Sequence, residues 1–206
     1  MTRPFDRHLR VAAVTAVVVL GFAGRAFPQA PQSPVTNTWS HGTTLELFAG
    51  AARATPNTAV GTFGTAVGWE LNKHAEVEGV AAWMPERRGA QSFAADLKLL
   101  VNLTRPGRVV PYLGAGAGLY RGSFEATLVA LPHFYQQRMP DFASRARATF
   151  TDPTAVIAGG ANLFTARHLS VRPELGVRLV TNGSDIYKVT TFTFAFIYHV
   201  EDHHKE

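Results

Sequence analysis

The segment Ser170–Leu179, SVRPELGVRL, alternates residue by residue between two kinds of side chain. Its odd-numbered positions hold Val, Pro, Leu, Val and Leu, and its even-numbered positions hold Ser, Arg, Glu, Gly and Arg. Successive side chains of a β-strand point to opposite faces. The segment therefore predicts a strand with one apolar face and one small or charged face.

The same two-residue period recurs from Gly42 onward and predicts eight strands. We expect them at Thr43–Gly50, Val60–Leu71, Ala75–Trp83, Phe93–Leu103, Val109–Phe124, Thr154–Phe164, Ser170–Leu179 and Tyr187–Tyr198. A weak helical window lies within 134–148. Longer connections, at 51–59, 85–91, 125–153 and 181–186, alternate with short ones at 72–73, 105–107 and 165–168. This order predicts an all-β fold: an eight-stranded antiparallel up-and-down transmembrane β-barrel, with short periplasmic turns and longer outer loops.

Alternation alone does not say which face points inward. We expect the apolar face to point outward at lipid, because charged residues share the other face with glycines, an arrangement that suits a filled, narrow interior. The expected interior ionic network is Glu46, Glu70, Glu76, Glu78, Asp96, Lys98, Arg172, Glu174 and Arg178. Aromatic girdles are expected from Trp69, Phe164 and Tyr198 near the short turns and from Phe63, Trp83, Phe124 and Tyr187 near the longer loops. A soluble secreted or periplasmic lipocalin-like barrel that binds an apolar ligand is the alternative.

The first thirty residues have the three parts of a Sec-type signal peptide. Three arginines precede the apolar run Val11–Phe22, and small residues follow it. A membrane-spanning helix needs about twenty apolar residues. We expect a signal peptide at 1–26, with cleavage after Ala26 or as late as Ala30, then a flexible periplasmic lead-in at 27–41. The barrel is expected at 42–199, with a polar tail at 200–206.

The net charge of +5 belongs mostly to this leader. Without residues 1–26, the chain has sixteen basic and fourteen acidic residues, so no nucleic-acid partner is expected. The chain has no cysteine, which excludes a disulfide framework, a cysteine nucleophile, a cysteine metal site and a lipoprotein anchor.

Three runs carry a family resemblance: Val109–Leu119 (VVPYLGAGAGL), Gly159–Leu163 (GGANL) and Arg172–Arg178 (RPELGVR). Together they resemble the small outer-membrane β-barrel domain of Gram-negative-type bacteria, the OmpA/OmpX-like eight-stranded barrel. The alternating aromatics of Phe192–Tyr198 resemble the terminal-strand signal that barrel-insertion machinery reads, although the tail Glu201–Glu206 follows where many members stop. The resemblance implies a monomer in the bacterial outer membrane.

The interior charges have two interpretations. Paired acids and bases would plug the lumen, because an eight-stranded barrel has little room beyond its own side chains. The alternative is a narrow, gated ion path.

The segment 125–153 combines aromatic residues with arginines. Arg138, Arg145, Arg147 and Tyr135 are candidate surface contacts, with lipopolysaccharide as the partner, because guanidinium groups bind phosphates well. A variable surface loop is the simpler interpretation.

Catalysis and metal binding have weak signals. His168, Ser170 and Glu174 have the residue types of a lipid A-modifying barrel enzyme, but the topology places His168 in a periplasmic turn. His199, His203 and His204 suit a solvated tail better than a metal site. The sequence therefore predicts no enzyme, cofactor or metal. It predicts an outer-membrane barrel with a structural or surface-interaction role.

Overall fold

The structure is a computed structural model. It describes residues 42–54, 58–87, 89–105, 107–126, 128, 131–136, 138–139, 141–142, 145–166, 168–182 and 185–200. The expected signal peptide, the lead-in and the tail beyond Val200 lie outside these residues. No helix in the described ranges is long and apolar enough to cross a membrane.

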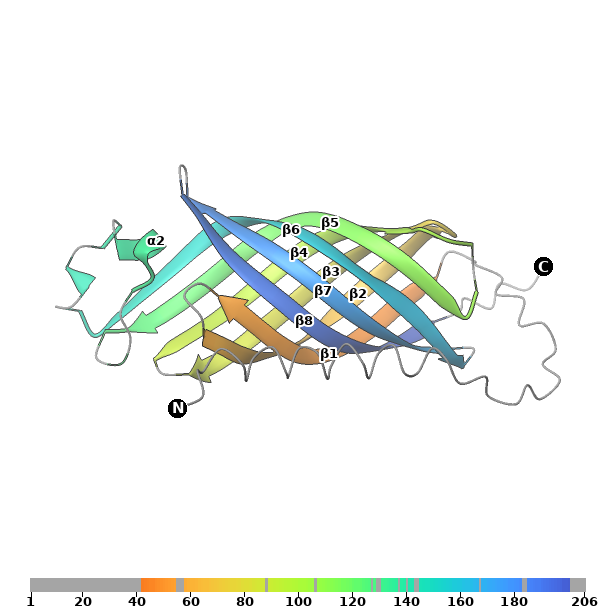
Figure 1. Ribbon diagram of the computed structural model, residues 1–206, viewed down its shortest axis with the longest axis horizontal. Helices are drawn as coiled ribbons and strands as arrows, with labels where there is room; N and C mark the ends of the chain where they lie inside the picture. The colour runs from red at the N-terminus through yellow and green to blue at the C-terminus, as the bar shows by residue number, and fades with distance from the viewer. Residues whose placement is uncertain are drawn as a thin grey trace, which may run out of the picture. The chain divides into compact units, whose positions relative to one another are not determined.

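The described chain forms a closed barrel of eight antiparallel strands (Figure 1). The strands are β1 (Thr43–Ala54), β2 (Thr58–Asn72), β3 (Ala75–Arg87), β4 (Ala90–Asn102), β5 (Val109–Glu125), β6 (Arg147–Ala166), β7 (Leu169–Asn182) and β8 (Asp185–Val200). Each strand pairs with the next one along the chain, and β8 pairs back onto β1, so the sheet has no free edge. One short helix, α2 (His133–Gln136), lies between β5 and β6. The predicted fold is confirmed.

The strands run further than predicted at the end that carries α2, which we call the loop end. There β1 continues to Ala54 and β3 to Arg87, whereas β6 already begins at Arg147. The prediction of four long outer connections was therefore wrong for three of them, and only 126–146 is long. The opposite end, with the connections 73–74, 103–108 and 167–168, is called the turn end.

The barrel is apolar outside and charged inside. Exposed outward residues include Leu47, Leu97 and Phe196, the last with 70% of its surface exposed. Buried residues that point inward include Glu78, Lys98 and Arg172. A soluble barrel has the opposite arrangement, so these faces are those of a barrel that spans a bilayer.

The expected aromatic girdles are correct only in part. Trp69 and Tyr198 are exposed near the turn end, and Phe63 and Trp83 are exposed near the loop end with their ring centroids 5.1 Å apart. The remaining three face elsewhere: Phe124 and Tyr187 are buried inside the barrel, and the ring of Phe164 lies against His199.

The polarity of the two faces reverses near the loop end. At the end of β5 the outward residues are Arg121, Ser123 and Glu125, and the inward ones include Tyr120 and Phe124. The start of β6 has the same inverted order. Such a reversal is expected where a strand leaves the hydrocarbon layer, because its outer face then meets water or polar headgroups.

Candidate functional site

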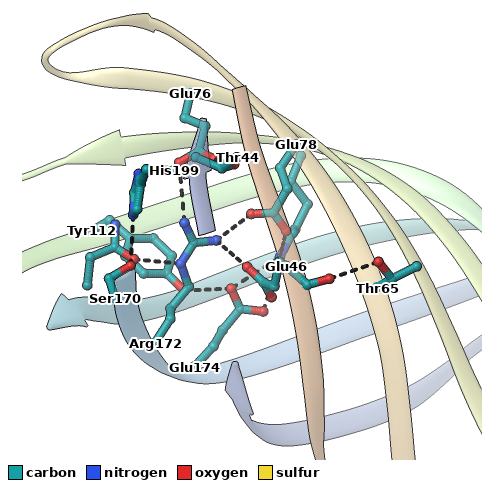
Figure 2. A network of polar contacts seen from close by, with 12 residues as sticks. Thr44, Glu46, Thr65, Glu76, Glu78, Tyr112, Ser170, Arg172, Glu174 and His199 are labelled. Atoms are coloured by element: carbon teal, nitrogen blue, oxygen red, sulfur yellow. Dashed lines mark hydrogen bonds and ion pairs between the residues drawn. The ribbon is translucent and has the colours of Figure 1, made fainter. Parts of the chain in front are cut away.

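Arg172, on β7, lies at the centre of the turn-end half of the lumen and is 1% exposed. Its Nη1 lies 2.9 Å from Glu46 Oε2 and 2.5 Å from Glu78 Oε2, and its Nη2 lies 3.3 Å from Glu76 Oε2. Figure 2 shows this single guanidinium facing the three carboxylates. Its Nε donates to Asn162 Oδ1 at 2.6 Å. Buried ionic groups need such dense pairing to be tolerated.

Lys98 extends the same network towards the loop end. Its Nζ lies 3.1 Å from Glu78 Oε1 and 3.1 Å from Glu174 Oε2. Tyr112 donates to Glu174 Oε2 at 2.6 Å, and the Arg172 guanidinium lies 5.1 Å from the Tyr112 ring centroid. We call Glu46, Glu76, Glu78, Lys98, Tyr112, Asn162, Arg172 and Glu174 the ionic network.

Two inward-facing glycines make room for these long side chains. A methyl group on Gly68 would overlap Glu76 and Thr44, whose hydroxyl donates to Glu76 Oε1 at 2.8 Å. A methyl group on Gly160 would lie 2.8 Å from the Tyr112 hydroxyl oxygen. The mixture of glycines and charges on one face therefore has a steric reason.

A second ionic pair, Arg178 with Asp96, lies nearer the loop end. Thr154 donates to Asp96 Oδ1 at 3.2 Å. A cavity of about 40 Å³ is bordered by this pair and by residues of the ionic network that include Glu46 and Glu174. That volume holds a few water molecules, at roughly 10–15 Å³ each.

Ser170, His199 and Glu70 form a third group at the turn end. Ser170 Oγ lies 2.9 Å from His199 Nε2, and His199 Nδ1 lies 3.6 Å from Glu70 Oε1. The order serine, histidine, carboxylate is that of a nucleophilic triad. However, Ser170 is 1% exposed, and a substrate carbonyl must come within about 3 Å of the attacking oxygen. The Ser170–His199 contact is therefore a structural hydrogen bond inside the barrel.

The catalytic set weighed in the sequence does not assemble. His168 Nδ1 lies 3.1 Å from the His199 carbonyl oxygen, Ser170 bonds His199, and Glu174 belongs to the ionic network. His203 and His204, the other residues considered for a metal, lie outside the described residues.

The loop end of the lumen is filled by aromatic side chains, which we call the mouth cluster. Its members are Tyr120, Phe124, Phe134, Tyr135, Phe142, Phe150 and Tyr187. Three of them come from the connection between β5 and β6. Tyr135 is fully buried, with its ring centroid 4.4 Å from that of Phe150 in a stacked arrangement. The long connection therefore folds back into the barrel's opening.

Arg138 fixes this connection to the barrel wall. Its Nη1 lies 2.5 Å from Oδ1 of the buried Asp152 on β6, and its guanidinium lies 5.1 Å from the Phe150 ring centroid. The Tyr135 hydroxyl and Asp152 Oδ2 are buried and have no hydrogen-bond partner among the described residues. Burial raises the pKa of Tyr135 above its ordinary range, with neighbouring Tyr120 and Asp152 adding to the effect, so the phenol stays neutral.

The predicted site residues thus fall into several places. Eight of the nine expected interior charges lie in the ionic network or in the Arg178–Asp96 pair, and Glu70 lies apart beside His199. Of the four predicted surface contacts, Tyr135 is buried and Arg138 is paired inward, whereas Arg145 and Arg147 are exposed. The sequence reasoning missed Tyr112, Asn162 and Asp152, although their even numbers place them on the same face as Gly114 and Gly160.

Comparisons with known proteins agree with this architecture. No family model and no curated protein matches the chain. Among solved structures, Neisserial surface protein A superposes with a TM-score of 0.56 at 8% identity, covering 76% of this chain and 95% of that one. The N-terminal β-barrel domain of Pseudomonas aeruginosa OprF gives a TM-score of 0.53 at 12% identity, covering 77% of this chain and 98% of that one. The outer membrane protein OprG of P. aeruginosa gives 0.51 at 11%, covering 79% and 97%. At these identities the likeness is one of fold, and the chain shares the small-barrel architecture of these proteins.

Proposed function

We propose that the protein is an outer-membrane β-barrel with a structural or surface-interaction role, that it has no enzymatic activity and that its lumen is plugged. The observation that carries this proposal is the pairing of an apolar outer wall with a filled interior. The ionic network occupies the turn-end half, and the mouth cluster occupies the loop end. Such a protein anchors itself in lipid by its barrel and presents its loop end to the exterior.

Cell fractionation combined with gel migration of boiled and unboiled samples tests the proposal. We expect the protein in the outer-membrane fraction, with an unboiled form that migrates differently because the closed barrel resists detergent. A protein that washes off membranes and migrates identically with and without boiling would contradict it.

The soluble lipocalin-like alternative is disfavoured by the outward leucines and phenylalanines of the wall. A lipocalin keeps an apolar pocket inside, but here the middle of the lumen holds Arg172, Lys98 and their carboxylate partners. An enzyme that modifies lipid A needs a nucleophile that meets lipid, and the serine–histidine pair of this barrel points inward.

A further inference from the structure

A groove on the outer wall near the loop end offers a binding site unrelated to the lumen. It has a volume of about 300 Å³ and is lined by residues of β3 to β6, including Trp83, Phe93, Arg121, Ser123, Arg147 and Thr149. The groove combines aromatic rings, hydroxyl groups and two guanidinium groups within one surface depression.

The groove lies at the height where the outer wall changes from apolar to polar. In the register, Arg121 is opposite Phe93 on β4 and Thr151 on β6. Two residues deeper along β5 lies the exposed Leu119, and the exposed Leu97 lies deeper on β4. A lipid at this position would cover these leucines with its acyl chains and place its headgroup beside Arg121.

Arg121 is available to an external ligand. Its side chain is exposed, and it has neither an ion-pair nor a hydrogen-bond partner among the described residues. Arg147 is 51% exposed, and its Nη2 lies 3.8 Å from Glu86 and 3.7 Å from Glu125, too far for hydrogen bonds. Exposed ion pairs of this kind contribute little and leave the guanidinium free to exchange partners.

Ser123 and Thr149 add hydroxyl donors between the two arginines. Their side-chain oxygens lie 3.1 Å apart, and Ser123 is largely buried in the groove. Guanidinium groups bind phosphate oxygens in a charge-assisted, two-pronged geometry, and hydroxyl groups complete such a site. Trp83 and Phe93 on the membrane side are residues that favour the interfacial depth of a bilayer.

We propose that this groove binds the phosphate headgroup of an outer-leaflet lipid, with Arg121 as its principal ligand and Arg147 at its outer rim. The inference rests on the proposed function, because only the loop end of an outer-membrane barrel meets the outer leaflet. It assigns the anionic contact to the wall of the barrel, not to the loop residues Arg138 and Arg145.

Binding by the detergent-solubilised full chain tests this assignment, with native mass spectrometry as the measurement. The probes are lipid A with two phosphates, the same lipid without phosphates, and inorganic phosphate. We expect the phosphorylated lipid to bind at least tenfold more tightly than the other two, and Arg121→Gln to weaken its binding about tenfold. Arg108→Gln, which removes an exposed arginine at the turn end, is the matched control and should bind like the wild type.

Three results would overturn the inference: equal binding of the lipid without phosphates, equal binding of inorganic phosphate, or equal losses in the two arginine variants. Boiled and unboiled migration shows whether each variant is folded. Lipid binding in micelles tests this inference alone. Fractionation of cells tests the proposed function separately, so the two failures can be told apart.

Discussion

At the scale of single residues, Arg172 neutralises more buried charge than any other side chain of the ionic network. It contacts one carboxylate from β1 and two from β3. We predict that Arg172→Met lowers the free energy of unfolding by about 3–5 kcal/mol, because removing one partner leaves buried charges uncompensated. Urea unfolding in lipid vesicles measures the change.

The matched control for this prediction is Arg108→Met, which makes the same replacement at an exposed site. It should change stability by less than about 0.5 kcal/mol. A cost below about 1 kcal/mol for Arg172→Met would show that the three carboxylates do not depend on this guanidinium.

Ser170 provides the second residue-scale prediction. Its distance to His199 is suitable for nucleophilic activation, but the hydroxyl is enclosed by the barrel. We expect no labelling by a serine-reactive fluorophosphonate in the folded protein, in wild type or in Ser170→Ala. Labelling of the wild type that the substitution abolishes would show that substrate reaches this hydroxyl and would contradict the non-enzymatic assignment.

Alternation predicted which side chains face the interior, but it did not predict which acids pair with which bases. Strict two-residue periodicity places Glu46 and Arg172 on the polar face of their strands. Their contact joins residues 126 positions apart and depends on closure of β8 onto β1 and on the register of every strand between them. The sequence shows more acidic than basic residues on the interior face, but it does not show that three of the carboxylates share the Arg172 guanidinium.

At the scale of elements, the connection between β5 and β6 is held in the barrel opening by the ion pair of Arg138 with the buried Asp152 and by aromatic packing. We predict that Arg138→Gln speeds chymotrypsin cleavage at Phe134, Tyr135 and Phe142, because the loss of its pair with Asp152 loosens the connection. Timed proteolysis followed by mass spectrometry gives the cleavage rates.

Arg145→Gln is the control from the same connection, because Arg145 is exposed. It should be cleaved at the wild-type rate. Equal rates for all three proteins would mean that the aromatic packing alone holds the connection, and that the Arg138–Asp152 pair contributes nothing.

The strand ends illustrate why sequence reasoning failed at the loop end. Within the bilayer, inward means polar, and alternation identifies both the strand and its orientation. On the loop-end side of the Leu119–Pro153 pair, the apolar side chains face inward and the polar ones face outward. Phe150 and Tyr187 therefore point inward although they are aromatic. If apolar side chains are assumed to face lipid along the whole strand, such residues resemble girdle or loop positions. The strands are then predicted too short.

At the scale of the whole molecule, the proposed plug of the lumen has two levels in series. The ionic network lies in the turn-end half and the mouth cluster lies at the loop end, with the 40 Å³ cavity among the residues of the charged interior. Two barriers in series mean that opening one leaves the other in place. The wild-type protein should therefore show no steady conductance in a planar bilayer.

The sharper test removes one barrier. We predict that replacing residues 127–145 by a short glycine–serine linker still gives no steady conductance, because Arg172 and Lys98 remain bound across the lumen to carboxylates of β1, β3 and β7. Differences in migration between boiled and unboiled samples establish that the shortened barrel is closed. A steady open current would show that the mouth cluster is the sole barrier.

Four carboxylates surround two cations in the ionic network. An opening through that network should therefore carry cations in preference to anions, and the reversal potential in a salt gradient measures that preference.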